Sequence, residues 1–251
     1  MTKSSSKQRL DILLVERNLA NSRNHAQALI MEGVVYVNGQ KIDKAGSQIK
    51  NDDQIDVKDS VLKYVSRGGL KLQSALMNFE IDVAGMVALD VGASTGGFTD
   101  CLLQHGALKV YALDVGYGQL DWKLRNDDRV VLMEKVNARH LQSKDIPERV
   151  DLIVMDVSFI SLTKIIPAAS QFLKPGGILI ALIKPQFEVG RGEVGKGGIV
   201  RKETKHHEVV NKIKEHLVEL QFVIIGDIPS PILGTQGNKE FLIAAKKHSN
   251  D

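Results

Sequence analysis

The feature that most constrains the fold of this chain is the alternation of short apolar runs with helical segments, which begins near residue 87. Runs such as LIVM and ILIALI are continuously apolar. Strands of this kind are buried on both faces, as in a parallel sheet that helices cover on both sides. The pattern therefore predicts a doubly wound α/β domain. We expect strands at 87–91, 110–115, 130–133, 152–157, 177–183, 222–226 and 241–245, and helices around 99–105, 162–173 and 203–220.

The N-terminal part of the chain follows a different pattern. Apolar residues at helical spacing predict two short helices, and Ser22 is expected to cap the second helix, which Gly33 ends. Alternating valines then lead to Asn38 and Gly39, a strong hairpin signal. With a further strand at 54–57, these elements predict a compact α+β module.

Composition excludes several classes of protein. The 251 residues are 43% hydrophobic and 25% charged, as in a folded globular chain, and the single cysteine excludes a disulfide framework. The sequence has no run of about eighteen apolar residues, and its basic N-terminus lacks the apolar stretch of a signal peptide. We therefore expect a cytoplasmic protein that does not interact with a membrane. A net charge of +3 is too small to indicate a nucleic-acid partner by itself.

The segment ALDVGASTGGFTD, from Ala88 to Asp100, follows a predicted strand and precedes a predicted helix. Its glycines allow a ligand to approach the backbone closely, although their spacing is G-x-x-x-G-G and not the G-x-G-x-x-G of dinucleotide sites. The next strand ends at Asp114, where a carboxylate can accept hydrogen bonds from both hydroxyls of a ribose. This combination is expected for a site that binds S-adenosylmethionine (SAM).

Two segments carry a resemblance to a known family. The loop DVGASTGGFTD resembles that of the FtsJ-type RNA ribose methyltransferases, and the N-terminal module is similar to the S4 RNA-binding fold in Arg9-Leu10-Asp11, Ser22-Arg23 and Val37-Asn38-Gly39. Together they resemble the TlyA (haemolysin A-like) family along nearly the whole chain. The resemblance implies a Rossmann-like, seven-stranded and mostly parallel sheet with the last strand antiparallel. It also implies an S4 domain at 1–62, a linker at 63–69 and a methyltransferase domain at 70–251.

The polar residues at the strand ends are the candidates for catalysis. Asp156 and Lys184 follow the fourth and fifth strands, so both are expected in the crevice beyond the carboxyl ends of the sheet. Glu240 begins the last strand and reaches the same edge if that strand is antiparallel, and Lys71 opens the domain. The resemblance implies that these four match the family's Lys-Asp-Lys-Glu tetrad.

The tetrad suits the methylation of a ribose 2′-hydroxyl, which must lose a proton as it attacks the methyl group. Lys184 is the candidate to orient the hydroxyl oxygen or to take its proton. A lysine is a base only when its pKa is lowered; a neighbouring cation such as Lys71 lowers such a pKa, whereas carboxylates raise it. The sequence leaves both roles open.

The expected ligands follow from these features. SAM is the only cofactor that we expect, with no metal, and the partner is ribosomal RNA or a ribosomal subunit. The candidate SAM-binding residues are Asp90, Gly92, Ser94, Thr95, Gly96, Gly97, Phe98, Asp114, Val115, Asn137 and Asp156. The candidate RNA-binding residues are Arg9, Arg17, Ser22, Arg23, Lys41 and Arg67, and shape and phosphates are expected to dominate recognition because few aromatic residues are available for stacking.

Other chemistries fit the sequence less well. Cys101, the nucleophile that a cytosine-C5 methyltransferase would need, is expected to be buried inside a helix. Adjacent histidines at 206 and 207 diverge on a helix and cannot easily share a metal. The glycine-rich loop at 188–198 lacks the Ser/Thr of a phosphate loop. Two interpretations of it stay open: a lid whose Arg191 and Lys196 meet RNA phosphates, and a solvated loop. Two rival functions stay open: a membrane-active haemolysin, and a ribosome-assembly factor without catalysis.

Overall fold

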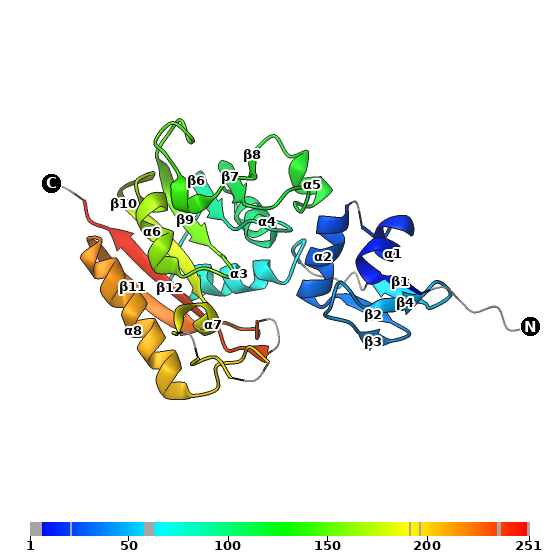
Figure 1. Ribbon diagram of the computed structural model, residues 1–251. Coiled ribbons are helices and arrows are strands. Elements are labelled where there is room, and N and C mark those ends of the chain that lie inside the picture. Colours follow the sequence, from blue (N-terminus) through cyan, green and yellow to red (C-terminus); the bar gives the residue numbers. More distant parts are fainter. Residues whose placement is uncertain are drawn as a thin grey trace, which may run out of the picture.

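The computed structural model describes residues 7–20, 22–57, 63–190, 192–195, 197–234 and 237–249, which form two parts that lie side by side (Figure 1). In the smaller, N-terminal part, two helices pack against short antiparallel strands. The helices are α1 (Leu10–Glu16) and α2 (Arg23–Glu32). The strands are β1 (Lys7–Arg9), β2 (Val35–Val37), β3 (Gln40–Lys41), β4 (Gln48–Lys50) and β5 (Ile55–Val57), which form the sheets β3-β2-β5 and β1-β4.

Both ends of α2 and the following hairpin agree with the prediction from sequence. Ser22 Oγ accepts a hydrogen bond from the backbone N–H of His25 at 3.1 Å, which satisfies one of the free amides of the first turn. Gly33 ends the helix with φ +74°. Asn38 and Gly39 connect β2 to β3, and both have the positive φ that a tight hairpin turn requires.

The larger part contains one sheet of seven strands. They are β6 (Val87–Val91), β7 (Lys109–Asp114), β8 (Val130–Glu134), β9 (Val150–Met155), β10 (Leu173–Ile183), β11 (Phe222–Pro229) and β12 (Phe241–Lys247). Their order in the sheet is β11-β12-β10-β9-β6-β7-β8. Strand β12 runs antiparallel to both of its neighbours, and the other neighbouring pairs are parallel. The predicted sheet, with its reversed last strand, is confirmed.

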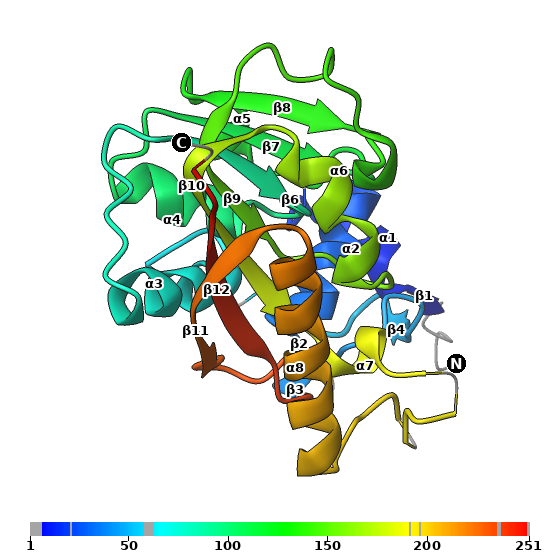
Figure 2. The same cartoon turned by 90° about the vertical axis from the view of Figure 1, so that its left-hand side faces the viewer.

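Helices cover both faces of this sheet (Figure 2). Helices α3 (Gly68–Asn78), α4 (Gly97–Gln104) and α5 (Trp122–Arg125) pack on one face, and α6 (Ile166–Ser170) and α8 (Glu203–Glu219) pack on the other. The side chains of a strand point alternately to the two faces, so Ala88 of β6 belongs to the core under α3 and α4, whereas Leu89 belongs to the opposite core. The continuous apolar runs of the sequence therefore reflect burial on both faces.

Some boundaries differ from the prediction. The single helix expected over 162–173 is divided into a 3-10 turn, η2 (Leu162–Lys164), and α6, because Pro167 has no N–H to continue a helix through this point. Strand β10 begins at Leu173, ahead of the predicted start, with a shift of register against β9 before Ile178. Helix α3 begins at Gly68, inside the stretch that we predicted as a linker.

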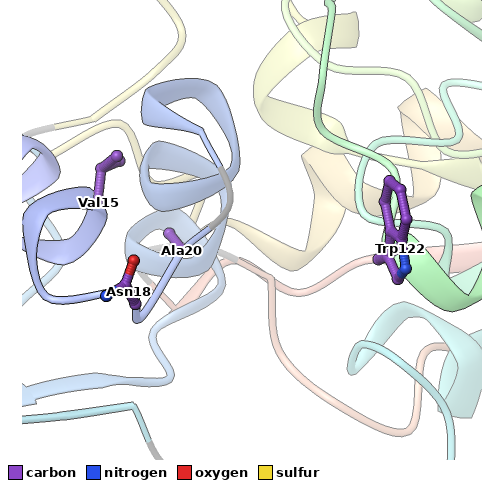
Figure 3. Close-up of a pocket in the computed structure, with 4 residues that line it drawn as sticks. All are labelled: Val15, Asn18, Ala20 and Trp122. Atoms are coloured by element: carbon purple, nitrogen blue, oxygen red, sulfur yellow. The ribbon is translucent and has the colours of Figure 1, made fainter.

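The two parts touch where α2 meets the loop after β7. Ser22 Oγ donates a hydrogen bond to the carbonyl oxygen of Gly118 at 2.8 Å, and Asn24 Nδ2 donates one to that of Tyr117 at 2.7 Å. A pocket between the two parts is lined by Val15, Asn18 and Ala20 of the smaller part and Trp122 of α5 (Figure 3). The smaller part thus contacts the edge of the sheet at which the parallel strands end.

Candidate active site

The carboxyl edge of the sheet gathers residues from four separate elements. Asp156 follows β9, and Lys184 follows β10. Because β12 is antiparallel to β10, its first residue, Phe241, pairs with Ile183 at the last position of β10. Glu240, one residue before β12, is therefore at the same edge as Lys184, as the sequence predicts for an antiparallel last strand.

Two ion pairs form at this edge. Lys71 Nζ, from α3, lies 2.6 Å from Glu240 Oε2, and Lys184 Nζ lies 2.6 Å from Asp156 Oδ1. Lys184 Nζ also donates a hydrogen bond to Ser158 Oγ at 2.8 Å. Lys71 and Glu240 are buried, and only about a tenth of each lysine side chain is exposed. The structure thus brings all four predicted catalytic residues together as two adjacent pairs.

The charges of the two pairs influence each other. Burial disfavours the charged form of Lys71, but the nearby carboxylates of Asp156 and Glu240 outweigh it and raise the pKa of Lys71. Burial likewise acts to raise the pKa of Asp156, but Lys184 and Lys71 outweigh it and lower that pKa. Lys71 is therefore a fixed positive charge bound to Glu240, and Asp156 is a fixed negative charge between two lysines.

Two glycines of the loop after β6 allow close packing at this edge. Gly92 and Gly96 both have positive φ, +89° and +99°. A Cβ atom on Gly92 would lie 2.7 Å from the carbonyl oxygen of Asp156, and one on Gly96 would overlap the side chain of Leu124. Any side chain at Gly92 would displace the backbone that carries Asp156. The loop after β6 and the end of β9 that carries Asp156 are thus packed against each other.

Asp114 lies at the end of β7, as predicted. Its Oδ2 accepts a hydrogen bond from Ser94 N at 2.9 Å and its Oδ1 accepts one from Gly116 N at 2.7 Å, so it joins the loops after β6 and β7. Each carboxylate oxygen retains capacity for another hydrogen bond. The adjacent Val115 is 73% exposed. A carboxylate beside an exposed apolar side chain suits a nucleoside, which has ribose hydroxyls and an apolar base face.

Asp90 is fully buried in β6. Thr99 Oγ1 donates a hydrogen bond to Asp90 Oδ2 at 2.7 Å, whereas Oδ1 has no hydrogen-bond partner within the described part of the chain. Burial raises the pKa of Asp90 to about 7. A buried acceptor without a partner fits a ligand that brings a hydrogen-bond donor or a positive charge.

Of the remaining candidate cofactor residues, three are internal and Asn137 is exposed. Thr95 and Phe98 are buried, and Phe98 belongs to the core beside α3. Gly97 packs against Ser66, just before α3. Asn137 Oδ1 accepts a hydrogen bond from Arg139 N at 3.1 Å at the start of the 3-10 turn η1 (Ala138–His140). Thr95, Phe98 and Gly97 thus support the glycine loop from the interior of the domain.

In the smaller part, Asp11 holds two of the candidate RNA-binding arginines. Arg9 Nη2 and Arg23 Nε both lie 2.9 Å from the same oxygen of Asp11, whose side chain is fully buried. The two arginine side chains are 39% and 54% exposed. A guanidinium has five N–H donors, so each arginine keeps donors for another partner. The buried carboxylate therefore presents two arginines at the surface in a fixed arrangement.

The other candidate RNA residues have varied surroundings. Arg17 donates hydrogen bonds to two backbone carbonyls in the turn between β4 and β5, and Arg67 Nη2 donates one to Leu233 O at 3.4 Å. Ser22 is engaged in the cap and in the contact between the two parts. Lys41 is exposed. These residues stay candidates for RNA binding.

The features that the sequence analysis set aside are mainly structural. Cys101 is buried, and burial raises the pKa of its thiol to about 12. Buried His206 donates a hydrogen bond from Nε2 to the carbonyl of Val200 at 2.8 Å. Arg191 and Lys196, expected to meet RNA, lie outside the described residues. Within the described ranges, no three His, Cys, Asp or Glu side chains are grouped to hold a metal, and no helix is long and apolar enough to cross a membrane.

Ser158 is a site residue that the sequence analysis did not identify. Its hydroxyl is the second partner of Lys184. It stands two residues after Asp156 in the segment that leaves the sheet, so its position beside a catalytic strand end is the only signal that the sequence offers.

Comparison with known proteins places this site in a family. Residues 64–247 match the model of the FtsJ-like methyltransferases, and residues 8–55 match that of the S4 domain. The 16S/23S rRNA (cytidine-2'-O)-methyltransferase TlyA of Mycobacterium tuberculosis is 45% identical over 236 residues, which are 94% of this chain and 88% of that protein. The chain belongs to the TlyA family of FtsJ-like methyltransferases. The family resemblance that we identified from sequence is confirmed.

Three further proteins are similar over most of this chain. Hemolysin A of Brachyspira hyodysenteriae is 46% identical, over 93% of this chain and 98% of that protein. A solved structure from Streptococcus thermophilus, of a protein named as a hemolysin, is 44% identical in sequence. It covers 98% of this chain and 90% of its own, with a TM-score of 0.75. A solved structure from Listeria monocytogenes, of a protein named as a SAM-dependent methyltransferase, is 17% identical and shares the fold. It covers 72% of this chain and 99% of its own, with a TM-score of 0.54.

Proposed function

We propose that this TlyA-family protein transfers a methyl group from SAM to a ribose 2′-hydroxyl of ribosomal RNA, and that its S4 domain docks the RNA. The observation that carries this proposal is the pairing of Lys184 with Asp156 and of Lys71 with Glu240 beside the glycine loop. The relatives named as rRNA 2'-O-methyltransferases support the choice of substrate. In this proposal, the segment that ends before α3 joins the two domains.

The residues around the glycine loop fit SAM. Asp114, with Val115 beside it, would hold the adenosine. Asp90 Oδ1, which has no hydrogen-bond partner among the described residues, would face a donor of the amino-acid part. Gly92 and Gly96 keep the loop close to the strand ends, as a ligand in contact with the backbone requires. When bound, SAM supplies an electrophilic methyl group carried on a positively charged sulfur.

Lys184 is the residue that would position the hydroxyl group. Lysine is ordinarily protonated at neutral pH, and here it is paired with a carboxylate. We therefore assign it the role of a donor that binds the 2′ oxygen and holds a lone pair of that oxygen in line with the methyl group. As the oxygen–carbon bond forms, the bond between the methyl group and the sulfur of SAM would break with its electron pair left on the sulfur, and the hydroxyl proton would pass to water. Asp156 and Ser158 fix the ammonium group in place.

Lys71 and Glu240 would act as the support of this arrangement. Their buried ion pair lies next to Asp156, whose negative charge Lys71 stabilises. Without Lys71, the carboxylates at this edge would repel each other, and Asp156 would hold Lys184 less firmly. The pair therefore preserves the geometry of the catalytic lysine.

RNA bound to the smaller domain would lie close to the carboxyl edge of the sheet. Arg9 and Arg23, held by Asp11, offer guanidinium groups that suit phosphate oxygens. Helix α2 carries Arg23 and also contacts the loop after β7 through Ser22 and Asn24. RNA bound to the arginines would thus lie next to the domain that performs the transfer.

The test is a methyl-transfer assay with purified protein, labelled SAM, and isolated small and large ribosomal subunits or their RNA. We expect label in ribosomal RNA, at a nucleotide whose ribose methylation blocks alkaline cleavage of the next bond. Label on a base, or none in RNA, would contradict the proposal. Leakage of dye from liposomes would favour the haemolysin alternative, and RNA binding without transfer would favour the assembly factor.

A further inference from the structure

Glu188 is a buried carboxylate that the proposed reaction does not use. It is the last residue of α7 (Pro185–Glu188), the short helix that begins directly after Lys184, and it is only 6% exposed. Its Oε2 accepts a hydrogen bond from Ser161 Oγ at 2.5 Å, and its Oε1 accepts one from Leu162 N at 2.7 Å. Burial raises the pKa of Glu188 because it destabilises the ionised carboxylate. Hydrogen bonds to that carboxylate compensate for the water it has lost.

These bonds are part of a series of contacts between two segments. One segment is α7 with the preceding Lys184, and the other follows Asp156 at the end of β9. Three contacts join them in order along both segments: Lys184 Nζ to Ser158 Oγ at 2.8 Å, the ring of Phe187 to that of Phe159 at 5.0 Å between centroids, and Glu188 to Ser161 and Leu162. The segment after Asp156 is thus held against Lys184 and α7.

The segment after Asp156 has a strained backbone. Phe159 has φ +64°, a left-handed conformation that bulky side chains rarely adopt, and it is 84% exposed, so burial of its own ring does not hold it there. A conformation of this kind persists only where the surroundings impose it. Ser158 is held by Lys184 on one side, and Ser161 and Leu162 are held by Glu188 on the other.

We propose that Glu188 is a positioning residue of the methyltransferase: it holds residues 158–162 against α7 and thereby sets the geometry of the Asp156–Lys184 pair. This inference rests on the proposed function. Its effect is indirect, through Ser161 and Leu162. Loss of the carboxylate would release the strained turn and with it Ser158, a hydrogen-bond partner of Lys184.

The experiment compares Glu188→Ala, Glu188→Gln and the control Glu208→Gln, a glutamate of α8 whose side chain is 58% exposed. We would measure single-turnover methyl transfer to ribosomal RNA, SAM affinity by calorimetry, and thermal unfolding. We expect Glu188→Ala to slow transfer about tenfold or more, because small displacements of reacting groups are costly, while SAM affinity stays within about twofold. Glu188→Gln should retain most of the rate, since its amide oxygen accepts from Leu162 N and its NH₂ group donates to Ser161 Oγ.

The outcomes separate the alternatives. A folded Glu188→Ala enzyme with the wild-type rate overturns the inference, and so does a Glu188→Gln enzyme as slow as Glu188→Ala, which would indicate acid–base chemistry at Glu188. If Glu188→Ala does not fold, the test uses Ser161→Ala, which removes one of the two hydrogen bonds to Glu188. This variant must slow methyl transfer while SAM affinity stays unchanged; otherwise the inference fails. A wild-type enzyme that methylates no RNA would instead overturn the proposed function itself.

Discussion

The Nζ atom of Lys71 lies 2.6 Å from Oε2 of Glu240, a contact that joins the first helix of the large domain to the start of its last strand. Both groups are buried, and the positive charge of Lys71 also reaches Asp156. This one ion pair therefore links the stability of the domain to the charge arrangement of its candidate active site.

The first prediction concerns the two partners of this pair. Lys71→Met leaves the buried Glu240 carboxylate without its cation and should lower the free energy of unfolding by about 3 kcal/mol. Glu240→Gln should cost less, because Lys71 can still interact with Asp156. Urea denaturation of both variants measures the difference. A smaller effect of Lys71→Met than of Glu240→Gln would show that the pair is not held together as the structure describes.

The second prediction concerns Lys184. Lys184→Ala should abolish methyl transfer, because the ammonium group that we propose to orient the ribose oxygen is lost, and SAM affinity should stay nearly unchanged. Lys174→Ala, which removes a lysine paired with Asp151 at the surface, is the matched control and should keep full activity. Transfer at the control rate by Lys184→Ala would remove the catalytic assignment.

The third prediction concerns the end of β7. Asp114→Ala should weaken SAM binding about tenfold or more, since it removes the proposed ribose acceptor and also frees the amides of Ser94 and Gly116. Calorimetric titration with SAM measures the affinity. Asp127→Ala, a carboxylate paired with Arg129, serves as the control. An unchanged affinity of Asp114→Ala would exclude Asp114 from the cofactor site.

The fourth prediction concerns pH. Burial raises the pKa of Asp90 to about 7, above its ordinary value of 3.8, so the folded protein favours the protonated form. The stability that this preference contributes is present below pH 3.8 and is lost as the pH rises through about 7. Asp90→Asn cannot lose stability in this way. Its stability relative to wild type should therefore increase by about 4 kcal/mol between pH 4 and pH 8.

Thermal and urea unfolding of Asp90→Asn and wild type at a series of pH values test this expectation. A difference in stability that does not change with pH would contradict the raised pKa. The same substitution should weaken SAM binding at pH 8, because the proposed acceptor loses its charge. Tighter binding by Asp90→Asn would show that Asp90 does not face the ligand.

The fifth prediction concerns the arginines on Asp11. Arg23→Ala should weaken RNA binding and reduce the slope of log affinity against log salt by about 1, as loss of one phosphate contact does. SAM affinity should not change. Arg129→Ala, an arginine of the larger domain paired with Asp127, is the control. An unaltered salt dependence in Arg23→Ala would remove this arginine from the RNA-binding surface.

The reversed last strand was implied by the family resemblance. The sequence by itself predicted where the strands lie along the chain, the cap of α2 and the carboxyl edge that holds Asp114, Asp156 and Lys184. These features depend on apolar periodicity and on turn chemistry, which act between residues close in the chain. The helix boundaries around Pro167 were harder to predict from sequence. A single missing N–H group there divides an otherwise continuous helical pattern.

Only the tertiary structure decided which charges meet. The sequence placed two lysines and two carboxylates at one edge, but packing pairs Lys71 with Glu240 and Lys184 with Asp156. It also brings Glu188 onto Ser161 and places Asp11 between two arginines. Such contacts depend on distances of a few ångströms and on burial, since both determine the strength of an ionic interaction. These quantities exist only once distant segments are packed together.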